Sequence, residues 1–147
     1  MPWLRDCFSR DMPLNYRLFA YGTLQLPEVF ERVCGFRGQG QSARIHGFRR
    51  VCLKGVAYPA IIQDDAGVVD GLVFLSGLEA AHFQKLDAFE DDFYVRITVE
   101  VELASGERLP AQSYALSERY LSLVIDSPWD LGRFTSQDRA RLLSRCD

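Results

Sequence analysis

The strongest structural constraint in this sequence is an alternation of apolar and polar side chains from Val95 to Leu103. Valine, isoleucine or leucine occupies every second position there, and arginine, threonine or glutamate occupies the positions between them. A period of two residues is typical of a β-strand with one buried face and one solvated face. The segment 104–107, Ala-Ser-Gly-Glu, predicts a turn, and residues 109–116 predict a returning strand whose Pro110 indicates an edge or end position.

Shorter apolar segments predict the rest of a sheet. Four further strands are expected, at residues 17–21, 44–53, 57–63 and 68–75. The first of these is short and almost continuously apolar, which predicts burial on both of its faces. The segment 64–67, Asp-Asp-Ala-Gly, predicts a turn between the last two strands.

Helix signals complete the prediction of the fold class. Pro27 suits the first turn of a helix that ends near Gly35. Ser76 is expected to cap a second helix, with Glu79 as its capping-box partner, and residues 136–144 predict a short third helix. Because strands and helices do not alternate strictly, they favour an α+β protein with a curled or closed sheet and two or three helices.

Composition indicates one ordinary globular domain over residues 1–147. The chain is 48% hydrophobic and 25% charged, with a net charge of −3, and its length suffices for one core. We expect residues 1–15 to form an N-terminal arm and residues 117–147 a C-terminal tail. No stretch of the sequence is basic enough to indicate nucleic acid as a partner. The sequence has neither a signal peptide nor a run of about 18 apolar residues that could cross a membrane. We therefore expect a cytoplasmic protein.

The residues for metal or nucleophile chemistry lack the usual spacing. The four cysteines are far apart, and neither of the two histidines has a ligand partner nearby in the sequence. The sequence contains no Gly-x-Ser-x-Gly elbow and no phosphate-binding glycine loop. We therefore expect no metal and no cofactor.

The segment 18–30, LFAYGTLQLPEVF, departs from the usual start of a helix. A helix leaves its first N–H groups without partners, and Ser, Thr, Asp or Asn usually accepts from one of them. Here Leu26, which cannot do so, precedes Pro27. Free N–H groups at a helix start form a site for an anion or a carbonyl oxygen, and Gly22 lets a ligand approach the backbone. The alternative is that water or Thr23 caps the turn.

A second departure is the acidic segment 86–96, LDAFEDDFYVR. Four acids stand at the end of the second expected helix, namely Asp87, Glu90, Asp91 and Asp92. The helix dipole disfavours each of them there by about 0.3–1 kcal/mol. Glu90 follows Phe89 at the edge of the apolar stripe, where burial in a cavity would raise its pKa and suit it to proton transfer. The alternative is a solvated acidic turn that Arg96 partly neutralises.

Together these segments resemble the gamma-glutamylcyclotransferase-like family. Residues 21–24, YGTL, look like the family's signature loop after the first strand, and residues 58–61, YPAI, look like its second signature. The acidic segment resembles its Leu-Asp-x-x-Glu-Gly-x-x-Tyr motif, with Glu90 at the catalytic position and Tyr94 at the aromatic one. Asp91 stands where the family usually has glycine, and we expect its side chain to affect the pocket or the turn. The resemblance covers residues 18 to 116, without the N-terminal arm or the tail around Trp129.

The resemblance implies a small closed β-barrel flanked by helices. It also implies a cofactor-free reaction in which a small γ-glutamyl amine or amide cyclises and releases 5-oxoproline. The family pattern implies that the backbone of Tyr21, Gly22, Thr23 and Leu24 binds the substrate and that Glu90 moves the proton. Tyr114, on the returning strand, is a further candidate for substrate binding, and a half-buried core tyrosine is the alternative.

Two other functions stay open on the sequence alone. A non-catalytic module on the same fold would bind a small acidic metabolite, and Asp91 is the residue that favours it. An amidase would use water in place of the substrate's own amine and would release glutamate. The identity of the product separates these alternatives, whereas the leaving group and the oligomeric state have no signature in the sequence.

Overall fold

The computed structural model describes residues 16–90 and 92–125. The predictions for the N-terminal arm, for Asp91, for Trp129 and for a helix at 136–144 lie outside these residues. In chain order the described elements are β1 (Leu18–Ala20), η1 (Thr23–Gln25), α2 (Pro27–Cys34), β2 (Gly40–Leu53), β3 (Val56–Phe74), α3 (Ala80–Glu90), β4 (Tyr94–Leu103), β5 (Arg108–Leu116), η2 (Glu118–Leu123) and β6 (Val124–Ile125), where η marks a 3-10 helix.

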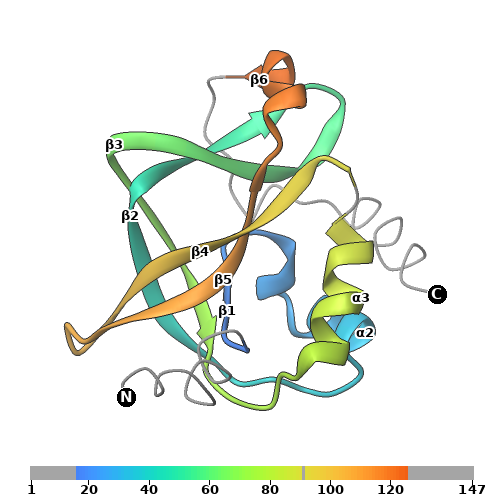
Figure 1. Ribbon diagram of the computed structural model, residues 1–147, viewed down its shortest axis with the longest axis vertical. Coiled ribbons are helices and arrows are strands. Elements are labelled where there is room, and N and C mark those ends of the chain that lie inside the picture. Colours follow the sequence, from blue (N-terminus) through green and yellow to red (C-terminus); the bar gives the residue numbers. More distant parts are fainter. Residues whose placement is uncertain (1–15, 91, 126–147) are drawn as a thin grey trace, which may run out of the picture.

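Five of the strands close into a mixed barrel (Figure 1). Neighbouring strands follow the order β3, β1, β5, β4 and β2, and β2 pairs back onto β3. Only the contact of β1 with β5 is parallel among these pairs of described strands. The short β6 adds to β2 at Cys52 and Leu53. The predicted α+β class and the closed barrel are therefore confirmed.

The short strand β1 connects the barrel interior to the helices. Phe19 packs inside the barrel with residues of the other strands, whereas Leu18 and Ala20 pack against the side chains of α2 and α3. The two α-helices lie side by side next to the barrel (Figure 1). Burying Phe19 or Leu18 contributes about 1.5–3 kcal/mol each. The predicted burial of this strand on both faces is confirmed, since all three residues are buried.

The boundaries of α2 agree with the prediction. The helix begins at Pro27 and ends at Cys34, and Gly35 follows with a φ of 83°. That left-handed conformation favours glycine and turns the chain out of the helix, after the N–H of Gly35 has made the last helical bond, to the carbonyl of Glu31 at 2.8 Å. The start and the stop of this helix are thus set by neighbouring residues.

The predicted start of α3 is wrong. The helix begins at Ala80, because the chain at Gly77 has a φ of +91° and leaves the helical conformation. The carbonyl of Glu79 accepts the N–H of His82 at 3.0 Å, and the N–H of Glu79 donates to Nδ1 of His82 at 2.8 Å. A histidine side chain therefore caps this helix, and Ser76 does not.

The predicted break between two strands at residues 64–67 is also wrong. β3 runs without interruption from Val56 to Phe74. Its pairing with β2 moves from Val68 opposite His46 to Gln63 opposite Phe48, so residues 64–67 form a bulge across from a single residue. The residues that signal a turn form this bulge and do not end the strand, because the ladder with β2 continues on both sides of them.

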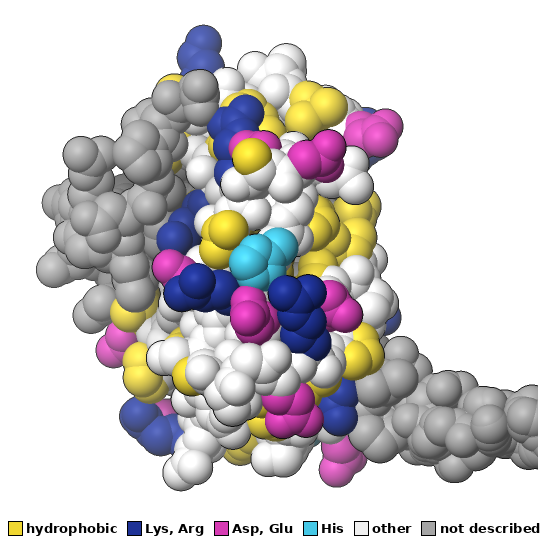
Figure 2. Space-filling view, turned by 90° about the vertical axis from the view of Figure 1, so that its left-hand side faces the viewer, with side chains coloured by type: hydrophobic (Ala, Val, Ile, Leu, Met, Phe, Trp, Pro, Cys, Tyr) yellow, Lys and Arg dark blue, Asp and Glu magenta, His cyan; other side chains and the backbone are white. Residues whose placement is uncertain are grey.

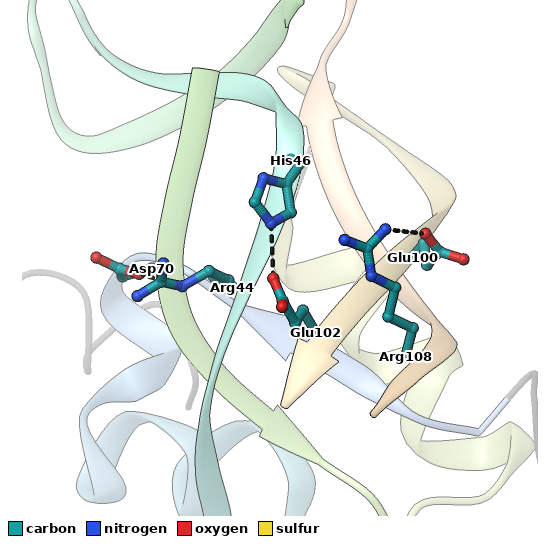
Figure 3. Close-up of polar contacts among 6 residues, drawn as sticks. All are labelled: Arg44, His46, Asp70, Glu100, Glu102 and Arg108. Carbon is teal, nitrogen blue, oxygen red and sulfur yellow. Dashed lines mark hydrogen bonds and ion pairs between the residues drawn. The ribbon is translucent and has the colours of Figure 1, made fainter. Parts of the chain in front are cut away.

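Charged side chains link the strands on the outer face of the barrel. Figure 2 shows that side chains of both signs gather around a histidine on one face of the molecule. Besides Arg49–Asp64 at 3.4 Å, three pairs join neighbouring strands, namely Arg44–Asp70 at 3.4 Å, His46–Glu102 at 2.7 Å and Arg108–Glu100 at 3.3 Å (Figure 3). The three join β2 to β3, β2 to β4 and β4 to β5, and the opposite charges of the arginine–carboxylate pairs favour this register. Among the described residues, no helix has the length and apolar character needed to cross a membrane.

Candidate active site

A cavity that opens to solvent lies where β1 ends beside the end of α3. Its walls come from residues 19–24, from Tyr58 and Pro59 of β3, from Phe89 and Glu90 of α3, and from Tyr94 and Tyr114. All of the predicted site residues therefore line one cavity. Glu90 is 66 residues away in the sequence from Leu24, the last residue of the predicted loop, and only the closed barrel brings them together.

The turn after β1 requires a glycine. A Cβ atom at Gly22 would lie 2.9 Å from Cγ of Pro59, so a side chain there would push the turn away from β3. The carbonyl of Gly22 accepts the backbone N–H of Gln25 at 3.0 Å and so opens the 3-10 turn η1. Arg50 holds the preceding residue in place, because its guanidinium donates to the carbonyl of Tyr21 at 2.6 Å.

The first turn of η1 carries the open backbone donors. Within the described part of the chain, the N–H groups of Gly22, Thr23 and Leu24 donate to no backbone carbonyl, and no side chain caps the turn. The first N–H groups of any helical turn lack partners within that turn. These three residues line the cavity, and open N–H groups of this kind are able to bind a carbonyl oxygen or a carboxylate.

The start of α2 is uncapped as predicted, yet it is not the source of these donors. Leu26 offers no side-chain cap and Pro27 has no N–H. The carbonyl of Leu26 accepts the N–H groups of both Val29 and Phe30 at 3.0 Å. The helix start thus satisfies part of its own backbone, and the preceding turn is the place where donors remain open.

Glu90 is the last residue of α3 and is half-buried in the cavity wall. Its charge contributes to the raised pKa of both Tyr21 and Tyr114, which line the same cavity. In each case burial is the largest cause of the increase. Glu90 is also the one ionisable carboxyl group among the described residues that line this cavity.

Hydrogen bonds tie the aromatic walls to the backbone. The hydroxyl of Tyr21 donates to the carbonyl of Tyr114 at 2.6 Å, and the hydroxyl of Tyr94 donates to the carbonyl of Pro59 at 2.7 Å. The hydroxyl of Tyr114 donates to Oδ1 of Asp87 at 2.6 Å. These bonds fix the walls of the cavity on three strands and one helix.

Sequence reasoning missed the supporting roles of Asp87 and Arg50. Asp87 lies three residues before Glu90 in the acidic segment, and that helical spacing is the signal that could have found it. Arg50 had no such signal, because its contact with Tyr21 depends on the packing of β2 beside the end of β1. Among the described residues no group of three metal-ligating side chains comes together.

The structural class of this protein is a small mixed β-barrel flanked by helices. Among its described residues, one carboxyl group and several open backbone donors share a cavity. The family model described as "Gamma-glutamyl cyclotransferase, AIG2-like" matches residues 18–131. The chain therefore belongs to the gamma-glutamyl cyclotransferase, AIG2-like family. The match extends past residue 116, so the expectation that the tail around Trp129 lies outside the resemblance is wrong.

Curated relatives from Arabidopsis thaliana agree with this assignment. AIG2-like protein C is 37% identical over 130 residues, which cover 84% of this chain and 72% of that protein. Protein AIG2 C is 32% identical over 103 residues, which cover 69% of this chain and 62% of that protein. Each match thus leaves more than a quarter of the relative without a counterpart.

Solved structures show the same fold. A solution structure of an Arabidopsis thaliana protein has a TM-score of 0.68 at 25% identity and covers 88% of this chain and 87% of its own. A solved gamma-glutamyl cyclotransferase has a TM-score of 0.63 at 16% identity and covers 88% of this chain and 98% of its own. At 16% identity the likeness concerns the fold alone.

Proposed function

We propose that this protein is a cofactor-free cyclotransferase that releases 5-oxoproline and a free amine from a γ-glutamyl amine or amide. The observation that carries the proposal is the placement of Glu90 and the open turn Gly22–Leu24 on one cavity. The family supports the same reaction class. The cavity supplies one proton acceptor and several oxyanion donors, which is what an intramolecular acyl transfer requires.

In the proposed reaction the substrate's α-amine attacks its own γ-carbonyl carbon. Glu90 accepts a proton from the amine as the new C–N bond forms, and it returns that proton to the leaving nitrogen as the old C–N bond breaks. The backbone N–H groups after Gly22 stabilise the oxyanion or hold the α-carboxylate. Both reacting groups belong to one molecule, so no encounter between two molecules is needed. Holding them in a bent geometry gives each an effective concentration of about 10⁵ M or more toward the other.

A product assay tests this proposal. The purified protein is incubated with a panel of γ-glutamyl amines and γ-glutamyl peptides, and 5-oxoproline and glutamate are both quantified. We expect 5-oxoproline from at least one member of the panel and a loss of about 100-fold or more in Glu90→Gln, which cannot accept the proton. Glutamate as the main product would indicate an amidase. Full activity in Glu90→Gln would contradict the role of Glu90.

A further inference from the structure

The hydroxyl group of Tyr114 is held as a hydrogen-bond donor inside the protein. A hydroxyl has one hydrogen to donate and two lone pairs that accept. Tyr114 donates to Oδ1 of Asp87 at 2.6 Å, and a bond to a carboxylate is among the stronger ones in proteins. Burial and this bond both raise the pKa of Tyr114, so the phenol keeps its proton. Toward any further partner, its oxygen offers lone pairs only.

Asp87 is held in position from a second side. Nε of Arg96, on β4, lies 3.5 Å from the same carboxylate oxygen of Asp87. The guanidinium of Arg96 also lies 5.1 Å from the centre of the Phe83 ring on α3. Asp87, whose side chain is 45% exposed, is therefore placed between a phenol of β5 and a guanidinium of β4.

The cavity has a donor side and an acceptor side. The donors are the backbone N–H groups of the turn Gly22–Leu24. The acceptors are the carboxyl group of Glu90 and the phenol groups of Tyr21, Tyr94 and Tyr114, each of which donates its own hydrogen within the wall, and Tyr114 is the one that donates to a carboxylate. No lysine or arginine is among the described residues that line the cavity. A zwitterionic ligand therefore has one favourable direction, with its carboxylate or carbonyl oxygen at the turn and its ammonium group near Glu90 and Tyr114.

We propose that Tyr114 binds the substrate's α-amino group through its phenolic oxygen, and that Asp87 is a positioning residue that keeps this oxygen an acceptor. The proposal rests on the proposed function, because it assigns the two ends of the γ-glutamyl group within that site. The ammonium group of the bound substrate donates one N–H to Tyr114 and releases one proton to solvent before the reaction. The neutral amine that remains still donates one N–H to Tyr114, its lone pair attacks the γ-carbonyl carbon, and its second N–H proton passes to Glu90 as the C–N bond forms.

The bond to Asp87 protects the nucleophile. If the hydroxyl of Tyr114 were free to rotate, its hydrogen would bond to the lone pair of the neutral amine and would hinder the attack. Because Asp87 accepts that hydrogen, the phenol binds the amine without occupying its lone pair. Tyr114 and Asp87 therefore have separable effects, the first on binding and the second on the rate of the bound substrate.

Binding of two small dicarboxylates tests the role of Tyr114. L-Glutamate and glutarate differ only in the α-amino group, and neither can cyclise with loss of an amine. We expect calorimetry to show that the wild-type protein binds L-glutamate about tenfold or more tighter than glutarate. Tyr114→Phe should weaken this preference, because it keeps the ring and removes one of the two acceptors of the ammonium group, while Glu90 remains. Tyr120→Phe is the matched control, since Tyr120 is outside the cavity and packs against Phe93.

Kinetics with an accepted γ-glutamyl substrate test the role of Asp87. Asp87→Ala should lower kcat about tenfold with a smaller change in KM and should keep the preference for L-glutamate. Asp87→Asn, which retains an acceptor oxygen, should restore most of kcat. A purely structural role would lower the melting temperature and affect both dicarboxylates alike, so a thermal melt accompanies each variant.

The two proposals fail separately. If no substrate yields 5-oxoproline but Tyr114→Phe weakens the preference for L-glutamate, the proposed function is wrong and the assignment of the ammonium site stands. If 5-oxoproline forms but Tyr114→Phe keeps the preference, the assignment is wrong. Failure of the wild-type protein to bind either dicarboxylate also overturns the assignment.

Discussion

The phenolic oxygen of Tyr114 lies 2.6 Å from Oδ1 of Asp87 and donates its hydrogen to it. The two residues are 27 positions apart in the sequence, on β5 and α3, and their bond joins the barrel to the helix that carries Glu90. A second phenol belongs to the same network, because Tyr21 donates to the backbone carbonyl of Tyr114 at 2.6 Å. The cavity wall thus couples the position of α3 to two buried tyrosines.

Buried phenols predict a loss of stability at alkaline pH. The pKa values of Tyr114 and Tyr21 are raised in the folded protein, chiefly by burial, whereas an unfolded tyrosine loses its proton near pH 10. A raised pKa adds stability that is complete below about pH 10 and is lost as the pH rises above it. Each tyrosine should therefore reduce the free energy of unfolding by about 1.4 kcal/mol per pH unit above about pH 10.

Urea denaturation of the wild-type protein and of Tyr114→Phe between about pH 9 and 11 measures this effect. The difference in free energy of unfolding between the two proteins should shrink as the pH rises, because phenylalanine does not titrate. A difference that stays constant across this range would show that Tyr114 ionises equally in both states. Tyr120→Phe again supplies the control for loss of an exposed hydroxyl.

Gly22→Ala should disrupt the donor turn. Its Cβ would lie 2.9 Å from Cγ and 3.1 Å from Cδ of Pro59, and such overpacking costs about 1–3 kcal/mol. Chemical denaturation measures that loss, and the product assay should show a larger loss because the turn moves away from its place in the cavity. The double variant Gly22→Ala with Pro59→Ala removes the clash and should recover part of both. Purely additive losses in the double variant would contradict this account.

The carboxyl group of Glu102 should titrate below its ordinary range. The hydrogen bond with His46 is the largest cause that lowers the pKa of Glu102, and the charges of Arg108 and Arg44 add to it. His46→Ala should therefore raise this pKa more than Arg44→Ala does. Carbon-detected NMR titration of the glutamate carboxyl groups measures both shifts. The reverse order would mean that the arginine charges, and not the hydrogen bond, control Glu102.

Cys34 should resist thiol reagents in the folded protein. Burial raises the pKa of its thiol to about 12, although the charge of Lys85 opposes this in part. At pH 8 a thiol with that pKa is ionised in only about one molecule in ten thousand, and the thiolate is the reactive form. Iodoacetamide labelling followed by peptide mass spectrometry should find Cys34 unmodified until urea unfolds the chain. Labelling at equal rates with and without urea would contradict its burial.

The sequence predicted the local features of the fold because neighbouring residues determine them. Pro27 and Gly35 mark the ends of α2, since proline suits a first helical turn and glycine adopts the left-handed end with a φ of 83°. The alternation from Val95 to Leu103 predicted β4, although Val95 itself is 47% exposed at the end of the strand. Signals of this kind need no knowledge of the rest of the chain.

Two local signals failed because other contacts outweighed them. The capping box at Ser76 and Glu79 did not form, because the chain turns at Gly77 and His82 caps the helix instead. The turn signal at residues 64–67 became a bulge, because β2 pairs with β3 on both sides of it. The first case was decided by a neighbouring side chain in the same helical turn, and the second by a partner strand.

By itself the sequence determined the α+β class, the family through its YGTL and LDAFE segments, and the choice of Glu90 as the candidate proton acceptor. Only the tertiary structure decided that the open donors belong to the turn Gly22–Leu24 and not to the start of α2. It alone placed Asp87 against Tyr114. Because the phenol donates its hydrogen to Asp87, its oxygen can only accept further hydrogen bonds. The physical reason is that helix ends and strands depend on short-range conformational preference, whereas the direction of a buried hydrogen bond depends on which distant groups the closed barrel brings within about 3 Å.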